Sequence, residues 1–175
     1  MSQALETRSS TIDDRAAIGA LNSAAFPDED LLPLVGELLE LPRVTRSLVA
    51  TIEGQVVGHA LFTLCEVDDA RYTAALLGPL AVAPPQQRRG VGSALIRAGF
   101  KALEGDDVPV VLVLGDPAYY GRFGFEPESA ITPPYPLPAE WNGAWRSLRL
   151  GQDSGPRSGM LSVPEPWRKP ELWAP

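Results

Sequence analysis

The sequence Gln87-Arg88-Arg89-Gly90-Val91-Gly92 is the most informative segment of this chain. It follows an apolar run over residues 76–82 and precedes residues 93–104, whose apolar positions have helical spacing. The order predicts a strand, a glycine turn and the start of a helix. The first amides of a helix lack carbonyl partners and lie at the positive end of its dipole. We therefore expect this turn to bind a phosphate group.

Composition restricts the classes of protein to which the chain can belong. Its 175 residues, 45% of them hydrophobic, are enough for one domain with a sizeable core. A net charge of −7 argues against a general nucleic-acid binder, which would need a basic face. The only cysteine is Cys65 and the only histidine is His59, which excludes an internal disulfide and argues against a metal site.

The sequence also gives an expectation about location. It contains no run of about 18 apolar residues, so we expect no membrane span and no membrane partner. The N-terminus carries no basic segment followed by an apolar one, which is the pattern of a secretory signal. We therefore expect a cytoplasmic protein.

Hydrophobic patterning predicts a mixed α/β domain. Strands are expected at residues 5–8, 47–52, 55–67 and 71–82, the last three joined by short turns and hence antiparallel. The strand–helix–strand unit over residues 76–114 predicts a parallel pair joined by a right-handed crossover. Gly78 and Pro79 are expected to interrupt pairing on one side of their strand. Further helices are expected at about 11–25, 31–41 and 117–123, and a last strand at 145–150.

The last third of the chain combines proline with tryptophan. Prolines prevent long helices there, whereas disordered segments rarely carry so many large aromatic residues. We expect an ordered but irregular region in which tryptophans pack on the core: Trp141, Trp145, Trp167 and Trp173. The predicted organisation is one domain over residues 1–150 and an extension over 151–175 packed on it.

Two familiar phosphate loops do not fit the glycine turn. A nucleoside-triphosphate loop ends in Gly-Lys-Ser/Thr, but Gly92 is followed by Ser93 and Ala94. A dinucleotide-binding loop needs a third glycine where this chain has Leu95, and it opens a parallel sheet rather than following antiparallel strands.

The turn instead resembles the Gln/Arg-x-x-Gly-x-Gly/Ala loop of the GNAT superfamily of N-acetyltransferases. A second segment, Gly-Asp-Pro-Ala-Tyr-Tyr-Gly-Arg-Phe-Gly-Phe over residues 115–125, resembles the later GNAT segment in which a tyrosine precedes a Gly-Phe pair. Both segments are most similar to the YhbS-like branch of this superfamily. The resemblance extends over about residues 5–150. The resemblance implies a central sheet of six to seven strands, with a splayed parallel pair and about four helices.

The resemblance also implies a cosubstrate, acetyl-CoA, and no metal. The turn would hold the coenzyme's pyrophosphate, and the end of the preceding strand would pair with its pantetheine arm in the gap near Gly78. The residues so implied are Leu80, Ala81, Val82, Gln87, Arg88, Arg89, Gly90, Val91, Gly92, Ser93, Asp116 and Tyr120.

The implied reaction is direct transfer of an acetyl group to a primary amine in a ternary complex. By the same resemblance, Tyr120 protonates the leaving thiolate and the Leu80 N–H stabilises the oxyanion. Glu66 is a candidate general base, but His59 and a water chain stay open as alternatives. A non-catalytic acyl-CoA-binding or sensor module on the same fold is the alternative function. The acceptor, a small molecule or a protein amine, would bind at residues 26–41 and 131–145, in a monomer or homodimer.

Overall fold

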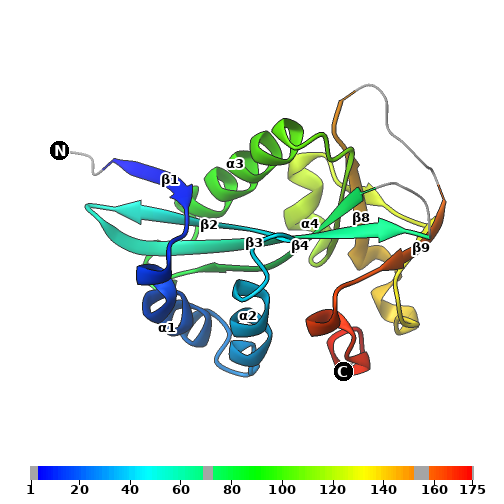
Figure 1. Cartoon of the computed structure of the whole chain (residues 1–175), viewed down its shortest axis with the longest axis horizontal. Helices are drawn as coiled ribbons and strands as arrows, with labels where there is room; N and C mark the ends of the chain where they lie inside the picture. Colours follow the sequence, from blue (N-terminus) through cyan, green and yellow to red (C-terminus); the bar gives the residue numbers. More distant parts are fainter. Residues whose placement is uncertain (1–3, 69–72, 152–157, 175) are drawn as a thin grey trace. The chain divides into compact units, whose positions relative to one another are not determined.

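The structure is a computed structural model that describes residues 4–68, 73–151 and 158–174 (Figure 1). The chain forms two compact units. The first comprises Met1–Phe62 and Gly78–Ala102, and the second comprises Thr63–Leu77 and Leu103–Pro175. Each unit is thus built from two separate stretches of the chain. The expectation of one domain over residues 1–150, with an extension over 151–175, stays a prediction.

The strands of the first unit follow the predicted order. They are β1 (Leu5–Ser9), β2 (Thr45–Ile52), the first part of β3 (Gln55–Val67) and the end of β4 (Thr73–Val82). The strands β1 and β2 are antiparallel, in a register that runs from Leu5↔Ile52 to Ser9↔Leu48. The bounds of β3 are those expected from the sequence. The two-residue turn before it has positive φ at both Glu53 (52°) and Gly54 (79°), as a tight hairpin requires.

Helices cover both faces of the β2–β3 pair in this unit. The helices α1 (Arg15–Ala25) and α2 (Leu32–Leu39) lie on one side, and α3 (Val91–Gly105) lies on the other (Figure 1). The short helix η1 (Ile12–Asp14) leads into α1 and has a capping box formed by Thr11 and Asp14. The apolar face of α1 and α2 supplies core residues Ile18, Leu21, Leu34, Val35 and Leu38.

Two glycines let α3 approach β3 closely. A Cβ atom built on Gly58 would lie 2.6 Å from Cγ1 of Val91 and 2.9 Å from Cδ1 of Leu95. A Cβ atom built on Gly99 would overlap the ring of Phe62. A larger residue at either position would push the helix away from the strand. The height of α3 above the sheet is therefore determined at Gly58 and Gly99.

In the second unit, β4 pairs with β5 (Val110–Leu114), followed by β8 (Trp145–Arg149) and β6 (Glu126–Pro127). The β4–β5 pairing is parallel, as the crossover predicts, and runs from Ala74↔Val110 to Leu77↔Val113. The ladder thus ends directly before Gly78, where the sequence predicts that pairing fails on one side.

The short strands of the second unit are less apparent in the sequence. The strand β7 (Ile131–Thr132) is parallel to β9 (Gly159–Ser162), and β9 pairs with Glu66 and Val67 at the end of β3. The described residues form nine strands, more than the six to seven expected, because β6 and β7 have only two residues each. The mixed α/β fold with parallel and antiparallel pairs is confirmed.

Tryptophans organise the irregular part of the second unit. Its remaining helices are α4 (Pro117–Tyr120), η3 (Gly121–Phe123), η4 (Ala139–Ala144), η5 (Glu165–Trp167) and η6 (Pro170–Leu172). The indole of Trp173 is 1% exposed, and its ring centroid lies 5.8 Å from that of Trp145 and 5.9 Å from that of Trp167. Each indole N–H donates a hydrogen bond: Trp145 to the Ile131 carbonyl, Trp167 to Thr63 Oγ1, and Trp173 to the Trp167 carbonyl. The prediction that tryptophans order this region is confirmed for these three.

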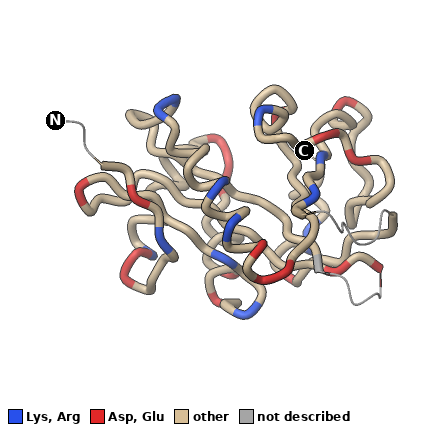
Figure 2. Tube along the Cα trace, turned by 90° about the horizontal axis from the view of Figure 1, so that it is seen from above, with Lys and Arg blue, Asp and Glu red and all other residues tan. Residues whose placement is uncertain are grey.

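Charged residues are interspersed along the trace. Lys and Arg positions, like Asp and Glu positions, are spread over many segments of the trace (Figure 2). No helix in the described part of the chain is long and apolar enough to cross a membrane.

Candidate active site

The glycine turn lies in the first unit between η2 (Pro84–Gln86) and α3. Its residues Gln87, Arg88, Arg89 and Gly90 are exposed. Two of them have left-handed backbones, Arg88 with φ 64° and Gly90 with φ 85°. Left-handed residues turn successive amides toward the same side, which is how a backbone concavity for anions forms. No atom lies within 4 Å of a Cβ built on Gly90, so the space above the turn is open.

The helix α3 begins two residues earlier than predicted, at Val91 rather than Ser93. Its first turn is closed by the Ala94 N–H, which donates to the Gly90 carbonyl at 3.0 Å. The amides of Val91, Gly92 and Ser93 therefore stand where a helix provides no carbonyl acceptor. Together with the exposed Arg88 and Arg89, these amides provide the hydrogen-bond donors and positive charge that a phosphate group requires.

Backbone hydrogen bonds hold the turn on the strands that precede it. The Ala83 N–H donates to the Val57 carbonyl of β3 at 2.9 Å. The Gln87 side-chain amide donates to the Val82 carbonyl at 3.1 Å, so this predicted site residue contacts its own chain. Of the predicted strand residues, Ala81 is buried, whereas Leu80 and Val82 are partly exposed.

Tyr120 lies in the second unit, at the end of α4. The preceding Asp116 caps this helix, because its Oδ1 accepts the Ala118 N–H at 3.0 Å. The Tyr120 ring makes edge contacts with Tyr119 (centroids 5.0 Å apart) and Phe125 (5.8 Å). A Cβ on Gly115 would overlap the Tyr120 ring, so this glycine is required for the ring to lie against the backbone.

The surroundings of Tyr120 determine its protonation. Burial raises the pKa of Tyr120 above its ordinary value of 10, and the nearby Tyr119 and Asp116 raise it further. The phenol therefore stays protonated throughout the physiological range. Such a group is a proton donor rather than a base.

Arg146 was not predicted as a site residue from the sequence, although its side chain joins the segments around Tyr120 by hydrogen bonds. Its Nε and Nη2 atoms donate to the Phe125 carbonyl at 3.2 and 3.0 Å, and Nη1 donates to the Gly143 carbonyl at 3.0 Å. Phe125 in turn packs on Tyr120. An arginine that binds only main-chain carbonyls leaves no motif in the sequence, so no pattern could have identified it.

Glu66 and His59, the two candidate bases, and Cys65, the only cysteine of the sequence, differ in accessibility. Glu66 is exposed and lies on β3 opposite Ser162 of β9. Cys65 is buried, and burial raises the pKa of its thiol to about 12, so it is no nucleophile.

His59 is 0% exposed, with Nε2 2.9 Å from the Ser47 hydroxyl. Burial lowers the pKa of its imidazole to about 4, against an opposing effect of the Asp14 charge. The Asp14 carboxylate is paired with the Arg8 guanidinium, which lowers the pKa of this carboxyl to about 2. A fully buried imidazole has no direct access to a substrate, and its burial favours a structural role for His59 over that of the base.

The structure thus places the predicted residues in two groups. The turn and the end of β4 belong to the first unit, and Glu66, Asp116 and Tyr120 belong to the second. Among the described residues, no group of three or more His, Cys, Asp or Glu side chains could hold a metal ion.

The mixed sheet whose β4–β5 ladder ends before Gly78, the exposed glycine turn before α3 and the protonated Tyr120 are the features of an acyl-CoA-dependent acyltransferase fold. Residues 6–127 match the family model described as the acetyltransferase (GNAT) domain, and the chain belongs to this family. Acetyl transfer from acetyl-CoA is the activity of the family, and the chain is accordingly an acyltransferase.

Individual relatives are similar over most of the chain. It is 36% identical over 162 residues to the uncharacterised N-acetyltransferase YjhQ of Escherichia coli (strain K12), covering 87% of this chain and 88% of YjhQ. It is 33% identical over 145 residues to the uncharacterised N-acetyltransferase YhbS of the same strain, covering 81% and 84%. The resemblance to the YhbS-like branch is confirmed.

Two solved structures extend the similarity to the fold. The E. coli YhbS structure, in complex with CoA, has a TM-score of 0.87 at 28% identity and covers 97% of this chain and 94% of its own. A GNAT family acetyltransferase from Brucella melitensis, in complex with acetyl-CoA, has a TM-score of 0.75 at 29% identity, with coverages of 95% and 99%.

Proposed function

We propose that this protein transfers an acetyl group from acetyl-CoA to a primary amine by direct attack in a ternary complex. The observation that carries the proposal is the exposed turn at the start of α3, with its amides, arginines and open space above Gly90. Family membership supports it, as do two similar structures that contain CoA or acetyl-CoA.

In this proposal the first unit binds the cosubstrate. The diphosphate accepts hydrogen bonds from the amides of Gly90, Val91, Gly92 and Ser93, while Arg88 and Arg89 supply positive charge, with Gln87 keeping the turn on the strand. A hydrogen bond to a charged acceptor contributes roughly 1.5–3 kcal/mol. The backbone of Leu80, Ala81 and Val82 pairs with the pantetheine arm, and the Leu80 N–H donates to the carbonyl oxygen as charge develops on it.

Tyr120 supplies the proton that the leaving thiolate needs. Its raised pKa keeps the phenol protonated, and transfer is expected as the C–S bond breaks because a phenol is a weaker acid than a thiol. Asp116 contributes through the cap that ends the loop before α4.

The acceptor amine must be neutral before it attacks. For a lysine-type amine, with a pKa near 10.4, deprotonation at pH 7 costs about 4–5 kcal/mol. Glu66 is our candidate for the base, because its carboxylate is exposed whereas His59 is buried. A water chain ending on backbone carbonyls is the competing route.

The acceptor class is either a small molecule or a protein amine, and the enzyme is proposed to act in the cytoplasm as a monomer or homodimer. The single cysteine is buried and unpaired, which is compatible with a reducing compartment.

The experiment that tests the proposal is calorimetric titration with acetyl-CoA, followed by a CoA-release assay across a panel of amines. Gly90→Glu places a strained, negatively charged residue beside the diphosphate and should abolish binding. Gly54→Glu is the matched control, because Gly54 also has positive φ (79°) and open space but lies in the β2–β3 turn. Equal affinity of the two variants for acetyl-CoA would contradict the assignment of the Gly90 turn as the diphosphate site. Binding of acetyl-CoA without turnover of any amine would favour the sensor module instead.

A further inference from the structure

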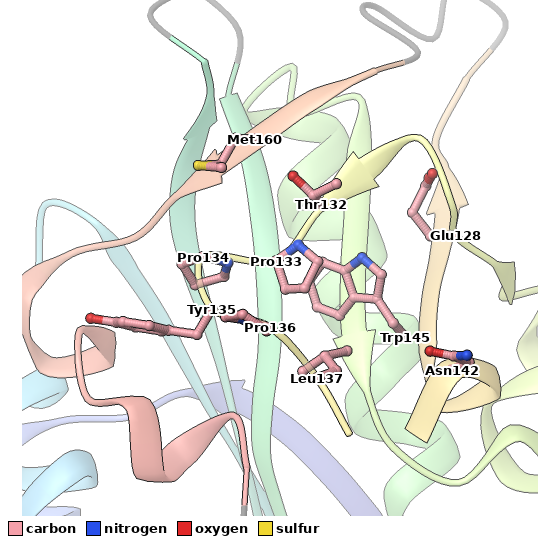
Figure 3. A pocket seen from close by; sticks show the side chains of 10 residues that line it. All are labelled: Glu128, Thr132, Pro133, Pro134, Tyr135, Pro136, Leu137, Asn142, Trp145 and Met160. Atoms are coloured by element: carbon pink, nitrogen blue, oxygen red, sulfur yellow. The ribbon is translucent and has the colours of Figure 1, made fainter. Parts of the chain in front are cut away.

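A cavity of about 430 Å³ lies in the second unit and is lined mainly by residues within 131–145, one of the two segments expected to bind the acceptor (Figure 3). Most of its lining is apolar: Pro133, Pro134, Pro136, Leu137, Trp145 and Met160. Pro133, Leu137 and Trp145 are grouped at the centre of the view, with Met160 and Thr132 toward one end and Asn142 toward the other (Figure 3). A cavity of this size and polarity is typical of a small-molecule site.

The only carboxylate in the lining, Glu128, is already fully engaged by the protein. Its side chain is 6% exposed. Oε2 accepts the N–H groups of Ala130 (2.7 Å) and Ile131 (3.0 Å), and Oε1 accepts the Ser147 hydroxyl at 2.8 Å. The Arg149 guanidinium lies 3.6 Å from Oε1. Glu128 therefore fixes the wall of the cavity and has no unpaired charge to offer a cation.

The other polar groups of the lining are neutral. The Thr132 hydroxyl donates to the Gly159 carbonyl at 3.3 Å. Within the described part of the chain, neither the Tyr135 hydroxyl nor the Asn142 amide has a hydrogen-bond partner. The Tyr135 hydroxyl points away from the side chains at the centre of the view, so the Asn142 amide is the neutral group offered to a ligand (Figure 3). The cavity thus combines a largely apolar lining with one available neutral polar group.

The cavity and Tyr120 flank the same end of β5. Trp145 pairs with Leu114, the last residue of β5, and the next residue, Gly115, donates its N–H to the Ala144 carbonyl at 2.9 Å. The Tyr120 ring lies against Gly115. The Trp145 wall of the cavity and the Tyr120 ring are thus both positioned by adjacent residues at the carboxyl end of β5.

From this arrangement we propose that the cavity binds the apolar body of the acceptor, so that the preferred substrates are arylalkylamines and similar amines with one charge and an apolar or aromatic side chain. The inference rests on the proposed function. Polyamines and other polycations are excluded as preferred acceptors, because each added positive charge would enter an apolar cavity without an unpaired carboxylate. The aromatic part of an arylalkylamine instead gains binding free energy from contact with the proline, leucine and tryptophan side chains.

Direct binding tests the cavity without relying on turnover. Calorimetric titration of the full chain with phenylethylamine should show saturable binding, and spermidine should bind at least tenfold more weakly. Leu137→Asp introduces an unpaired carboxylate and should reverse this preference, weakening phenylethylamine and strengthening spermidine. Ala139→Asp is the matched control, since Ala139 is exposed in the same segment and outside the lining. Met160→Trp, at a side chain that is 55% exposed, reduces the cavity volume with little risk to folding and should weaken phenylethylamine at least tenfold.

The outcomes separate the inference from the proposed function. Tighter binding of spermidine to the unmodified protein, or equal effects of Leu137→Asp and Ala139→Asp, would overturn the cavity assignment. Absence of phenylethylamine binding would overturn it as well. Selective phenylethylamine binding that Met160→Trp weakens supports the assignment even if no acetyl product forms, and in that case the proposed function alone fails.

Discussion

Gly115 and Tyr120 are in direct contact: the position that a Cβ on Gly115 would take is occupied by the Tyr120 ring, with Cδ2 at 2.9 Å. A methyl group at Gly115 must therefore move the phenol. Gly115→Ala should lower kcat by roughly 10²-fold, the effect of a displacement of about 1 Å in a reacting group, while the affinity for acetyl-CoA is retained. Gly143→Ala is the control, because its Cβ would meet only Pro117 Cγ, at an ordinary 3.8 Å. Equal kcat in the two variants would show that Tyr120 need not occupy this position.

Tyr120→Phe removes the proton donor and keeps the ring. Turnover should fall by roughly 10²-fold with acetyl-CoA affinity unchanged, as measured by steady-state kinetics and calorimetry. Because the pKa of Tyr120 is raised above 10, the unmodified enzyme should lose no activity through ionisation of this donor between pH 7 and 9. Tyr119→Phe is the control variant for Tyr120→Phe, because Tyr119 is the neighbouring tyrosine and is half-buried. Unchanged turnover in Tyr120→Phe removes the phenol from the mechanism.

Glu66→Gln tests the base. If the carboxylate accepts the amine proton, the amide should lower kcat/KM by roughly 10²-fold or more, with the largest loss for amines of high pKa. Ser162→Ala alters the residue opposite Glu66 on β9 and should leave kcat/KM unchanged. A Glu66→Gln enzyme as active as the unmodified one would assign deprotonation to water.

His59 should make stability depend on pH. The imidazole titrates near 6.5 in the unfolded chain but only near 4 when folded, so the unfolded state binds more protons between these values. Stability is therefore full above pH 6.5 and is lost as the pH falls toward 4, by on the order of 3 kcal/mol in total.

Urea unfolding at pH 7.5 and pH 5.5 measures this effect. His59→Gln should remove most of the difference between the two pH values, and it is an informative variant because the chain has no other histidine. Glu29→Gln, at an exposed position, should retain the difference. A similar pH dependence in His59→Gln and the unmodified chain would refute the assignment.

Local chemistry made the main elements predictable from sequence. The long apolar run over residues 55–67 and its flanking turns predicted the bounds of β3, and the glycines after residue 87 located the turn before α3. Gly78 and Pro79 marked the end of the β4–β5 ladder, because proline cannot donate to it. In each case the information lies within a few residues along the chain.

Features that depend on distant residues could not be predicted. The burial of His59 depends on the segments packed around it, and its position in an apolar strand is compatible with either a structural or a catalytic role. The strands β7 and β9 have four residues or fewer, and they form where β9 meets both β7 and the end of β3, which are distant in the sequence. The hydrogen bonds of Arg146 and Glu128 join residues up to about 20 positions apart, with no spacing that repeats.

The close contact of α3 with β3 sets a condition for protein engineering. Val91 begins the helix whose first amides form the turn, and the same side chain rests where Gly58 has no Cβ. Grafting residues 87–93 onto another scaffold would therefore transfer the loop sequence without its support, unless the recipient strand also had a glycine at the position of Gly58 and the recipient helix had one at the position of Gly99. A donor segment for such a graft has to include Gly58 and Gly99, which lie outside the recognisable motif.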